Sequence, residues 1–477
     1  MDTLLSILTT TGIIIGVILL FNLMIFIHEL GHFWAARWRG LHVDRFQIWF
    51  GKPWWKKEVN GVQWGIGWIP AGGFVSLPQL APMESIEGKA DLPEGLKPVK
   101  PLDKLIVAAA GPVFSFLLAV VFAVAVWLIG KPVAESVGTT IGYVQAGSPA
   151  EKAGLKPGDT ILEIDGAPVT KWVGNMEGVT ELVMMGERDT VDFLVQRPGV
   201  EKPLLIKSGY ELPDKKWYER KAMRMVGIVK ADPCVIGSVL PDSPAAKAGL
   251  KPGDKVKAVN GAPIMSVAAV REASKSGVPL EWTIERDGKE MSVQVTPVLP
   301  SNWKKGAMDA QPIAGTLWAS SFDRTQLEHP TPWQQVGVSL KWMGDTFQKI
   351  AAPKSDVGVE QLSGPVGIGS HLYRMFSSPD GWMMVLWFAV ILNVNLAVLN
   401  ILPLPVVDGG HVVLSLLEMI FKRPVGGVVL EYVQTGFVFV LMAFFLFVTF
   451  KDFGDLFGGG SKPSEELPPP VFRSADA

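Results

Sequence analysis

Four long apolar runs separate the polar stretches of this chain. The runs cover residues 12–27, 105–129, 383–404 and 432–450, and none contains a charged side chain. A helix needs about 20 apolar residues to cross about 30 Å of hydrocarbon. The first run reaches this length because apolar character resumes at residues 33–36. The pattern predicts four transmembrane helices. Asp2 and the lack of Lys or Arg before the first run favour a retained helix over a cleaved signal peptide.

The distribution of Lys and Arg predicts the orientation of these helices. Ten Lys and Arg residues lie between the first and second runs, Lys422 and Arg423 lie between the last two, and none precedes the first. Cytoplasmic loops carry an excess of Lys and Arg. Both loops are therefore expected in the cytoplasm, which leaves both termini and the long stretch 131–381 outside it.

The long stretch contains an internal repeat. Residues 148–159 and 243–254 differ at one position, and each copy has Ser followed by Pro at the start of a short predicted helix and Gly at its end. A predicted strand with an Asp-Gly or Asn-Gly turn follows in both copies. The repeat resembles two tandem PDZ domains of the circularly permuted bacterial form, at 133–215 and 222–300. Such domains bind extended chains or C-termini by strand addition; two small sandwich-like domains without a peptide ligand are the alternative.

Composition narrows the function classes. Only 19% of residues are charged, against about 25% in soluble domains, so part of the chain is expected in lipid. The net charge of −2 gives no electrostatic footprint for nucleic acid. Cys234 is the only cysteine, which excludes intrachain disulfides and thiolate zinc sites; its place at the start of a predicted strand is typical of a small buried hydrophobe. A metal site must draw on six histidines and on carboxylates.

The motif His-Glu-Leu-Gly-His at residues 28–32 follows the first apolar run. Side chains four apart share one face of a helix, so His28 and His32 can reach one metal ion. Glu29 beside them can then act on water at that ion, which is the arrangement of many zinc proteases. The alternative is a polar cluster at a helix end, and it is costly because ionisable groups at membrane depth need partners.

A catalytic zinc site uses three protein ligands and one water. Asp408 is the candidate third ligand because it follows an apolar run and an acid there needs a cation partner. Two prolines precede it, and Gly409 and Gly410 permit close backbone approach. His411 is the competing ligand.

Three segments carry a family resemblance: residues 28–37, 46–54 and 400–411. They resemble the site-2 protease family of intramembrane metalloproteases, and the tandem PDZ insertion is similar to that of its bacterial regulator-of-sigma-E branch. The resemblance implies one zinc ion per chain on His28, His32 and Asp408, with Glu29 as catalytic base. It also implies that Asn395 and Asn400 help bind the substrate or its oxyanion. Ser115 departs from the family pattern, which usually has Asn at this position.

The segment between the first two helices has glycines alternating with bulky apolar residues. Gly65 and Gly67 separate Trp64, Ile66 and Trp68, and Gly72 and Gly73 follow. The resemblance implies a membrane-associated β-hairpin whose open edge pairs with unwound substrate, with these four glycines as substrate-binding positions. An ordinary interfacial hairpin anchored by tryptophans is the alternative.

The remaining segments complete the expected fold. An amphipathic helix at residues 333–350 is expected to lie on the outer membrane surface or to pack on a PDZ copy. The fold class is a polytopic α-helical membrane protein with two inserted PDZ-like domains. Its expected parts are the first helix 1–37, the hairpin region 38–103, the second helix 104–130, a linker 301–382, the third helix with its loop 383–427, the fourth helix 428–453 and a disordered tail 454–477.

The expected function is regulated intramembrane proteolysis by a zinc metalloendopeptidase of a bacterial inner membrane. The expected partners are membrane lipid and single-span substrates, such as a trimmed anti-sigma factor or leftover signal peptides. Peptide or C-terminal ligands of the PDZ copies are also expected, and nucleic acid is not. The alternative is a non-catalytic, membrane-anchored PDZ receptor, which would gain nothing from a buried metal site. A transporter would show inverted repeats, and the sequence shows none.

Overall fold

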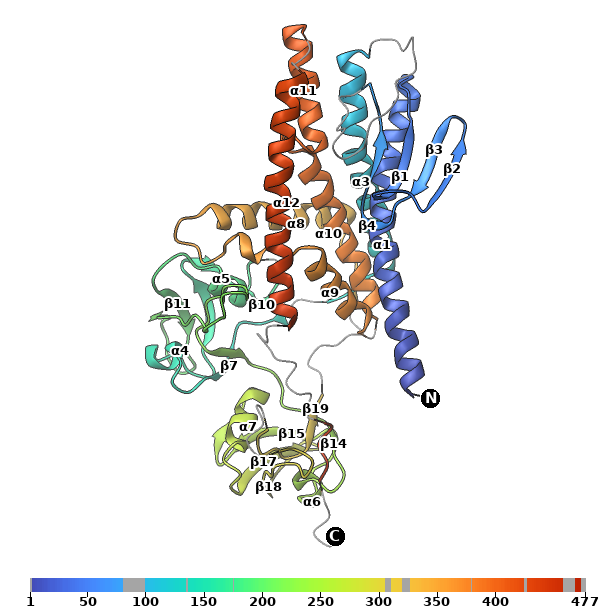
Figure 1. Cartoon of the computed structure of the whole chain (residues 1–477). Helices are drawn as coiled ribbons and strands as arrows, with labels where there is room; N and C mark the ends of the chain where they lie inside the picture. Colours follow the sequence, from blue (N-terminus) through green and yellow to red (C-terminus); the bar gives the residue numbers. More distant parts are fainter. Residues whose placement is uncertain are drawn as a thin grey trace. The chain divides into compact units, whose positions relative to one another are not determined.

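The computed structural model describes residues 2–79, 99–133, 136–174, 176–304, 310–319, 327–378, 380–423, 427–457 and 468–472. Residues 80–98 of the expected hairpin region, and residues 458–467 and 473–477 of the expected tail, lie outside this range. The chain forms two compact units (Figure 1). Unit 1 comprises Met1–Pro132, Leu327–Asp345 and Ser363–Phe450; unit 2 comprises Val133–Gln326, Thr346–Leu362 and Lys451–Ala477.

Four helices in the described part of the chain are long and apolar enough to cross a membrane, as predicted. In unit 1, α3 contacts α1, α10 and a further helix, α11. The contact with α1 is close because a Cβ atom on Gly31 would lie 2.5 Å from the carbonyl oxygen of Ala110. The four helices are α1 (Asp2–Arg39), α3 (Pro101–Ile129), α10 (Gly381–Ile401) and α12 (Gly427–Phe457), and α11 spans Asp408–Phe421.

A four-stranded sheet follows α1, where a hairpin was expected. Its order is β2-β3-β1-β4, with β1 and β3 parallel. Phe46 of β1 stacks on Trp64 of β3 with ring centroids 4.4 Å apart, and Phe33 of α1 packs against both. The aromatic cluster therefore attaches the sheet to α1. The strands are β1 (Arg45–Phe50), β2 (Trp55–Val59), β3 (Val62–Ile66) and β4 (Ile69–Ser76).

The expected amphipathic helix is α8 (Pro332–Ala351). Its first half packs on membrane helices, because Val336 is buried with residues of α3 and α10. Gln335 donates a hydrogen bond of 2.9 Å to the carbonyl of Ala123 on α3. This half of α8 therefore contacts the spanning helices while Trp333 is exposed, and its position on the outer membrane surface stays a prediction. A shorter helix that was not predicted, α9 (Pro365–Phe376), precedes α10.

Residues 133–326 form a large insertion, and the two strands of unit 1 that flank it pair with each other. Strand β5 (Lys131–Pro132) pairs antiparallel with β20 (Leu327–Glu328). Lys131 forms an ion pair with Glu328, and its ammonium lies 4.9 Å from the ring centroid of Trp387 on α10. This short ladder closes the base of the insertion.

Unit 2 contains two β domains with separate cores. The predicted helix caps are confirmed. The Ser148 and Ser243 side chains accept hydrogen bonds from the third residue of their helices, and Gly154 has φ 87°. The first β domain contains β7 (Ile141–Val144), α4 (Pro149–Ala153), β8 (Thr160–Ile164), α5 (Val179–Met184), β11 (Val191–Gln196), β12 (Leu204–Ser208) and β13 (Ile228–Lys230). The second contains β14 (Ile236–Val239), α6 (Pro244–Lys247), β15 (Lys255–Val259), α7 (Val267–Ser274), β17 (Leu280–Arg286), β18 (Lys289–Val295) and β19 (Thr316–Trp318).

The expected boundaries of the two domains, 133–215 and 222–300, are too short. Strand β13 pairs with β7, which extends the first β domain to Lys230. Strand β19 pairs with β14, which extends the second to Trp318. In each domain the last strand therefore comes from sequence beyond the repeated block. Cys234 is buried in the second core, as expected.

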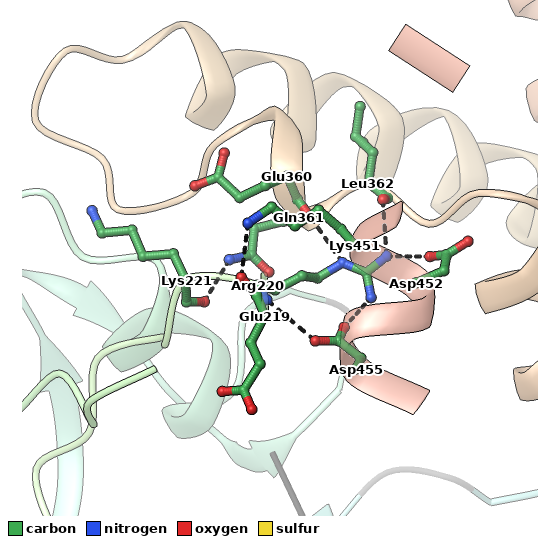
Figure 2. Close-up of polar contacts among 9 residues, drawn as sticks. All are labelled: Glu219, Arg220, Lys221, Glu360, Gln361, Leu362, Lys451, Asp452 and Asp455. Atoms are coloured by element: carbon green, nitrogen blue, oxygen red, sulfur yellow. Dashed lines mark hydrogen bonds and ion pairs between the residues drawn. The ribbon is translucent and has the colours of Figure 1, made fainter. Parts of the chain in front are cut away.

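An arginine joins three segments of unit 2 (Figure 2). Arg220 forms ion pairs with Asp452 and Asp455 near the end of α12 and donates a hydrogen bond of 2.8 Å to the carbonyl of Glu360. Lys451 donates a 3.0 Å bond to the carbonyl of Glu219. The Asp452 side chain is fully buried at this ion pair.

The expectation of a disordered tail is wrong for two parts of it. Residues 454–457 belong to α12. Pro468, Pro469 and Val471 accept hydrogen bonds from the second β domain through their carbonyl oxygens.

Candidate metal centre

Helix α1 brings two imidazoles to one point. His28 and His32 are one turn apart on the same face, both are buried, and their Nε2 atoms lie 3.3 Å apart. Neighbouring helix α3 orients the rings. The Nδ1 atom of His32 donates a hydrogen bond of 2.8 Å to the Val107 carbonyl, and the Nδ1 atom of His28 lies 2.9 Å from the Ser115 hydroxyl. Because a carbonyl can only accept, the Nε2 atom of neutral His32 is left as a bare lone pair.

The start of α11 supplies a carboxylate to the same point. The backbone turns sharply after α10, and a Cβ atom on Gly409 would lie 2.1 Å from the Leu402 carbonyl oxygen. Glycine is required there, as the sequence predicted. Asp408 Oδ2 lies 3.1 Å from Nε2 of His28, and Oδ1 lies 3.3 Å from Nε2 of His32. His411, the competing candidate, is outside this cluster.

These three side chains fit a zinc ion. Ligand atoms on a tetrahedron with bonds of about 2.0 Å lie about 3.3 Å apart. The two Nε2 atoms are 3.3 Å apart, and each faces a different oxygen of the Asp408 carboxylate, at 3.1 Å for His28 and 3.3 Å for His32. Asp408 Oδ2 is buried without a hydrogen bond in the described part of the chain. A carboxylate oxygen that faces an imidazole lone pair is repelled unless a cation lies between them. Two histidines and one carboxylate are a known catalytic zinc set.

Gly111 of α3, which was not among the predicted site residues, lies next to the two imidazoles and leaves room for them. A Cβ atom on Gly111 of α3 would lie 2.2 Å from Nε2 of His32 and 2.8 Å from Nε2 of His28. Any side chain there would collide with both candidate ligand nitrogens. In the sequence Gly111 is a glycine next to Pro112 within an uncharged run. This pattern does not show whether the glycine makes room for the metal ligands or serves ordinary helix packing.

The side chain of Glu29, a residue of α1, lies next to strand β4. A Cβ atom on Gly73 would lie 3.4 Å from Cγ of Glu29, so the strand passes directly over this side chain. Among the described residues, strand β4 is an edge strand of the sheet and pairs with β1. Gly72 and Gly73 are therefore the predicted glycines nearest to the metal centre.

The other two predicted glycines are not at an open edge. Strand β3, which contains Gly65, pairs with β1 on one side and β2 on the other. The amide of Gly67 donates a hydrogen bond of 2.8 Å to the Ile48 carbonyl. The expectation that Gly65 and Gly67 pair with substrate is therefore wrong, because their strand partners come from elsewhere in the sheet.

Two asparagines of α10 were expected to bind substrate. The side-chain carbonyl of Asn395 is buried without a hydrogen-bond partner among the described residues, and so is that of Asn393. Asn393 donates its amide to the Ala389 carbonyl at 2.8 Å. Asn400 lies partly buried in the last turn of α10.

Comparison with known proteins identifies the family. Residues 16–444 match Peptidase family M50. A protein from Pasteurella multocida that carries a zinc metalloprotease name is 30% identical over 456 residues, 91% of this chain and 97% of its own length. Protease RseP of Yersinia pestis is 29% identical over 87% of this chain and 91% of its own length. The regulator of sigma E protease of Haemophilus influenzae is 28% identical over 90% and 96%. This chain belongs to the M50 peptidases and is a membrane-associated zinc metalloprotease.

Proposed function

We propose that this zinc metalloprotease cleaves single-span membrane proteins within the bilayer of a bacterial inner membrane. The observation that carries the proposal is the metal centre itself. His28, His32 and Asp408 each offer one ligand atom, all within 4.8 Å of one another, and the two histidines belong to a helix long and apolar enough to span a membrane. Two relatives carry the name regulator of sigma E protease, and we propose an anti-sigma factor as one substrate.

The candidate site residues have different proposed roles in the reaction. Zinc, when bound by the three ligands, supplies Lewis-acid chemistry and brings the pKa of water to near 7. The Glu29 carboxylate accepts a proton from the attacking water and delivers it to the amine that leaves when the C–N bond breaks. The Asn395 carbonyl is proposed to accept a hydrogen bond from substrate, which its lack of a partner among the described residues supports.

Strand β4 is proposed to hold the substrate in an extended form. A transmembrane helix hides its carbonyls in its own hydrogen bonds, so it must unwind before water can attack. The edge of β4 opposite β1, which has no strand partner among the described residues, carries Gly73 beside Glu29. Strand addition on this edge would place the unwound backbone next to the proposed base.

The two β domains are proposed to be PDZ domains that control access. Each has a Ser-capped short helix, a four-stranded antiparallel sheet and a final strand, β13 or β19, paired on one side only among the described residues. We place both domains and both termini outside the cytoplasm, because Lys and Arg concentrate in the opposite loops. From there the domains cannot hold the scissile bond. They can exclude substrates with bulky external parts.

The test of catalysis replaces Glu29 by Gln in the full chain. Glu29 is not in the ligand cluster, so the variant should retain one zinc per chain and lose at least about 100-fold in cleavage rate. Glu58→Gln, at an exposed acid on β2, is the matched control and should cleave at the wild-type rate. Near wild-type cleavage by Glu29→Gln would remove Glu29 from the mechanism, and loss of zinc would make it structural.

The test of access control deletes residues 146–297. The deletion should cut a substrate with an intact external domain, which the wild type rejects, and both proteins should cut a trimmed form. A deletion that still rejects the long form refutes the size filter and leaves the β domains as receptors for another chain.

A further inference from the structure

The segment Pro468–Phe472 lies against the second β domain, beside β14 and α6 (Figure 1). Beside it is a groove of about 610 Å³, named the tail groove, which Phe472 itself helps to line. The other lining residues are apolar (Pro244, Ala248, Val298 and Leu299) and polar (Asp242, Lys247, Gln294, Thr296 and Ser301). Phe472 forms part of the wall of this groove and is only 8% exposed, whereas the adjacent Val471 is 52% exposed. The two neighbouring side chains therefore have opposite environments.

The backbone of the segment is bound by three consecutive residues after the second core. The Asn302 amide donates to the Pro469 carbonyl at 2.9 Å, and its oxygen accepts from the Val471 amide at 3.0 Å. The Ser301 amide donates to the Val471 carbonyl at 2.9 Å. These bonds satisfy main-chain groups of the segment and require no particular side chain.

Proline chemistry explains why this sequence suits the groove. The Trp303 indole N–H donates a 2.8 Å hydrogen bond to the carbonyl of Pro468. Grooves that recognise polyproline II segments combine aromatic side chains with donors to proline carbonyls, and proline loses little entropy because its backbone is already restricted. Gly315 adds room for the aromatic ring, since a Cβ atom there would lie 3.1 Å from the Phe472 ring.

We propose that Pro468–Phe472 is an intramolecular ligand of the second β domain and that its docking links this domain to the end of α12. Ten residues separate Phe457 from Pro468, and a chain of that length spans at most about 40 Å. The docked segment therefore limits how far the second β domain can move from Phe457. The chain already connects the second β domain to the rest of the protein where it enters and where it leaves the domain, and the docked segment adds a third connection. This third connection does not depend on catalysis.

Hydrogen exchange of the full chain tests the docking directly. The amides of Ser301 and Val471 should be protected in the wild type. Phe472→Ala removes most of the buried apolar contact and should speed their exchange about tenfold or more. Val471→Ala is the matched control, because its side chain is exposed, and it should change exchange by less than about twofold. Equal exchange in wild type and Phe472→Ala would overturn the proposal.

A second measurement separates ligand recognition from general loosening of the fold. A chain that ends at Leu467 should bind a synthetic peptide of residues 468–477, and Phe472→Ala in the peptide should weaken binding about tenfold or more. Trp303→Phe in the protein keeps an aromatic ring but loses the N–H, and it should also weaken binding. Failure to bind the peptide refutes recognition. Protection that rises with protein concentration in the full chain would assign the groove to the tail of a second copy and refute the intramolecular link.

Discussion

Gly111→Ala is expected to destroy the metal centre without removing a ligand. The new Cβ would lie 2.2 Å from Nε2 of His32, whereas ordinary non-bonded contacts are about 3.5 Å. The imidazole would therefore have to move by about 1 Å, but metal–ligand distances tolerate only about ±0.2 Å. Changes outside the ligand set typically cost 10–100-fold in affinity. Displacing a ligand should cost at least about 100-fold, or about 2.8 kcal/mol of zinc-binding free energy.

A second glycine separates this effect from the general consequence of Gly→Ala in a helix. Ala is favoured over Gly in a helix interior by about 0.5–1 kcal/mol, so an unobstructed substitution should be neutral or stabilising. Gly16 of α1 meets that condition because its nearest neighbour, a ring atom of Phe376, would lie 3.8 Å from the new Cβ. Gly16→Ala should therefore keep zinc and activity.

The assay measures zinc content by atomic emission and zinc affinity by competition with a chelator in purified detergent-solubilised protein. Gly111→Ala should purify with little zinc and show little cleavage of a model single-span substrate. Unchanged helical circular dichroism would show that the fold is kept. One zinc per chain at wild-type affinity in Gly111→Ala would refute the reasoning, because the ring could then not be where the structure places it.

Three further predictions test other residues. Asp408→Ala should lose most bound zinc while His411→Ala keeps it, because only Asp408 lies in the ligand cluster; zinc titration of both variants checks this, and the reverse order would contradict it. Ser115→Ala should lower zinc affinity about 10–100-fold by freeing the His28 ring, whereas Ser115→Asn should largely retain it. Burial and the nearby Asp232 raise the pKa of Cys234 to about 11, so little thiolate forms at pH 7.5, and maleimide should label it at least about 100-fold more slowly in native than in unfolded protein.

Local patterns predicted the features of the structure that depend on short stretches of sequence. The apolar runs located the four spanning helices, and the spacing of His28 and His32 placed them on one face of α1. Ser148 caps its helix as expected, because a cap depends only on the next three residues. Gly409 occupies a close backbone approach, as the Gly-Gly pair after two prolines indicated.

Features that depend on distant segments could not be predicted in this way. The pattern around Gly65 indicates a strand, but not that β1 would cover one side of it and β2 the other. The composition of the tail indicates disorder, yet Asn302 and Trp303, more than 160 residues away, bind its backbone. Gly111 matters only because α1 faces α3 at that level.

The arrangement of the metal centre explains how one chain can carry a large insertion between its catalytic segments. The proposed ligands come from α1 and α11, and α3 orients the imidazoles through Ser115 and Val107. All of these groups belong to unit 1. The insertion begins and ends at the β5–β20 ladder, so its two ends meet whatever lies between them. The ladder therefore holds the two ends of the insertion together, so a change within residues 133–326 need not alter the separations of the ligand atoms.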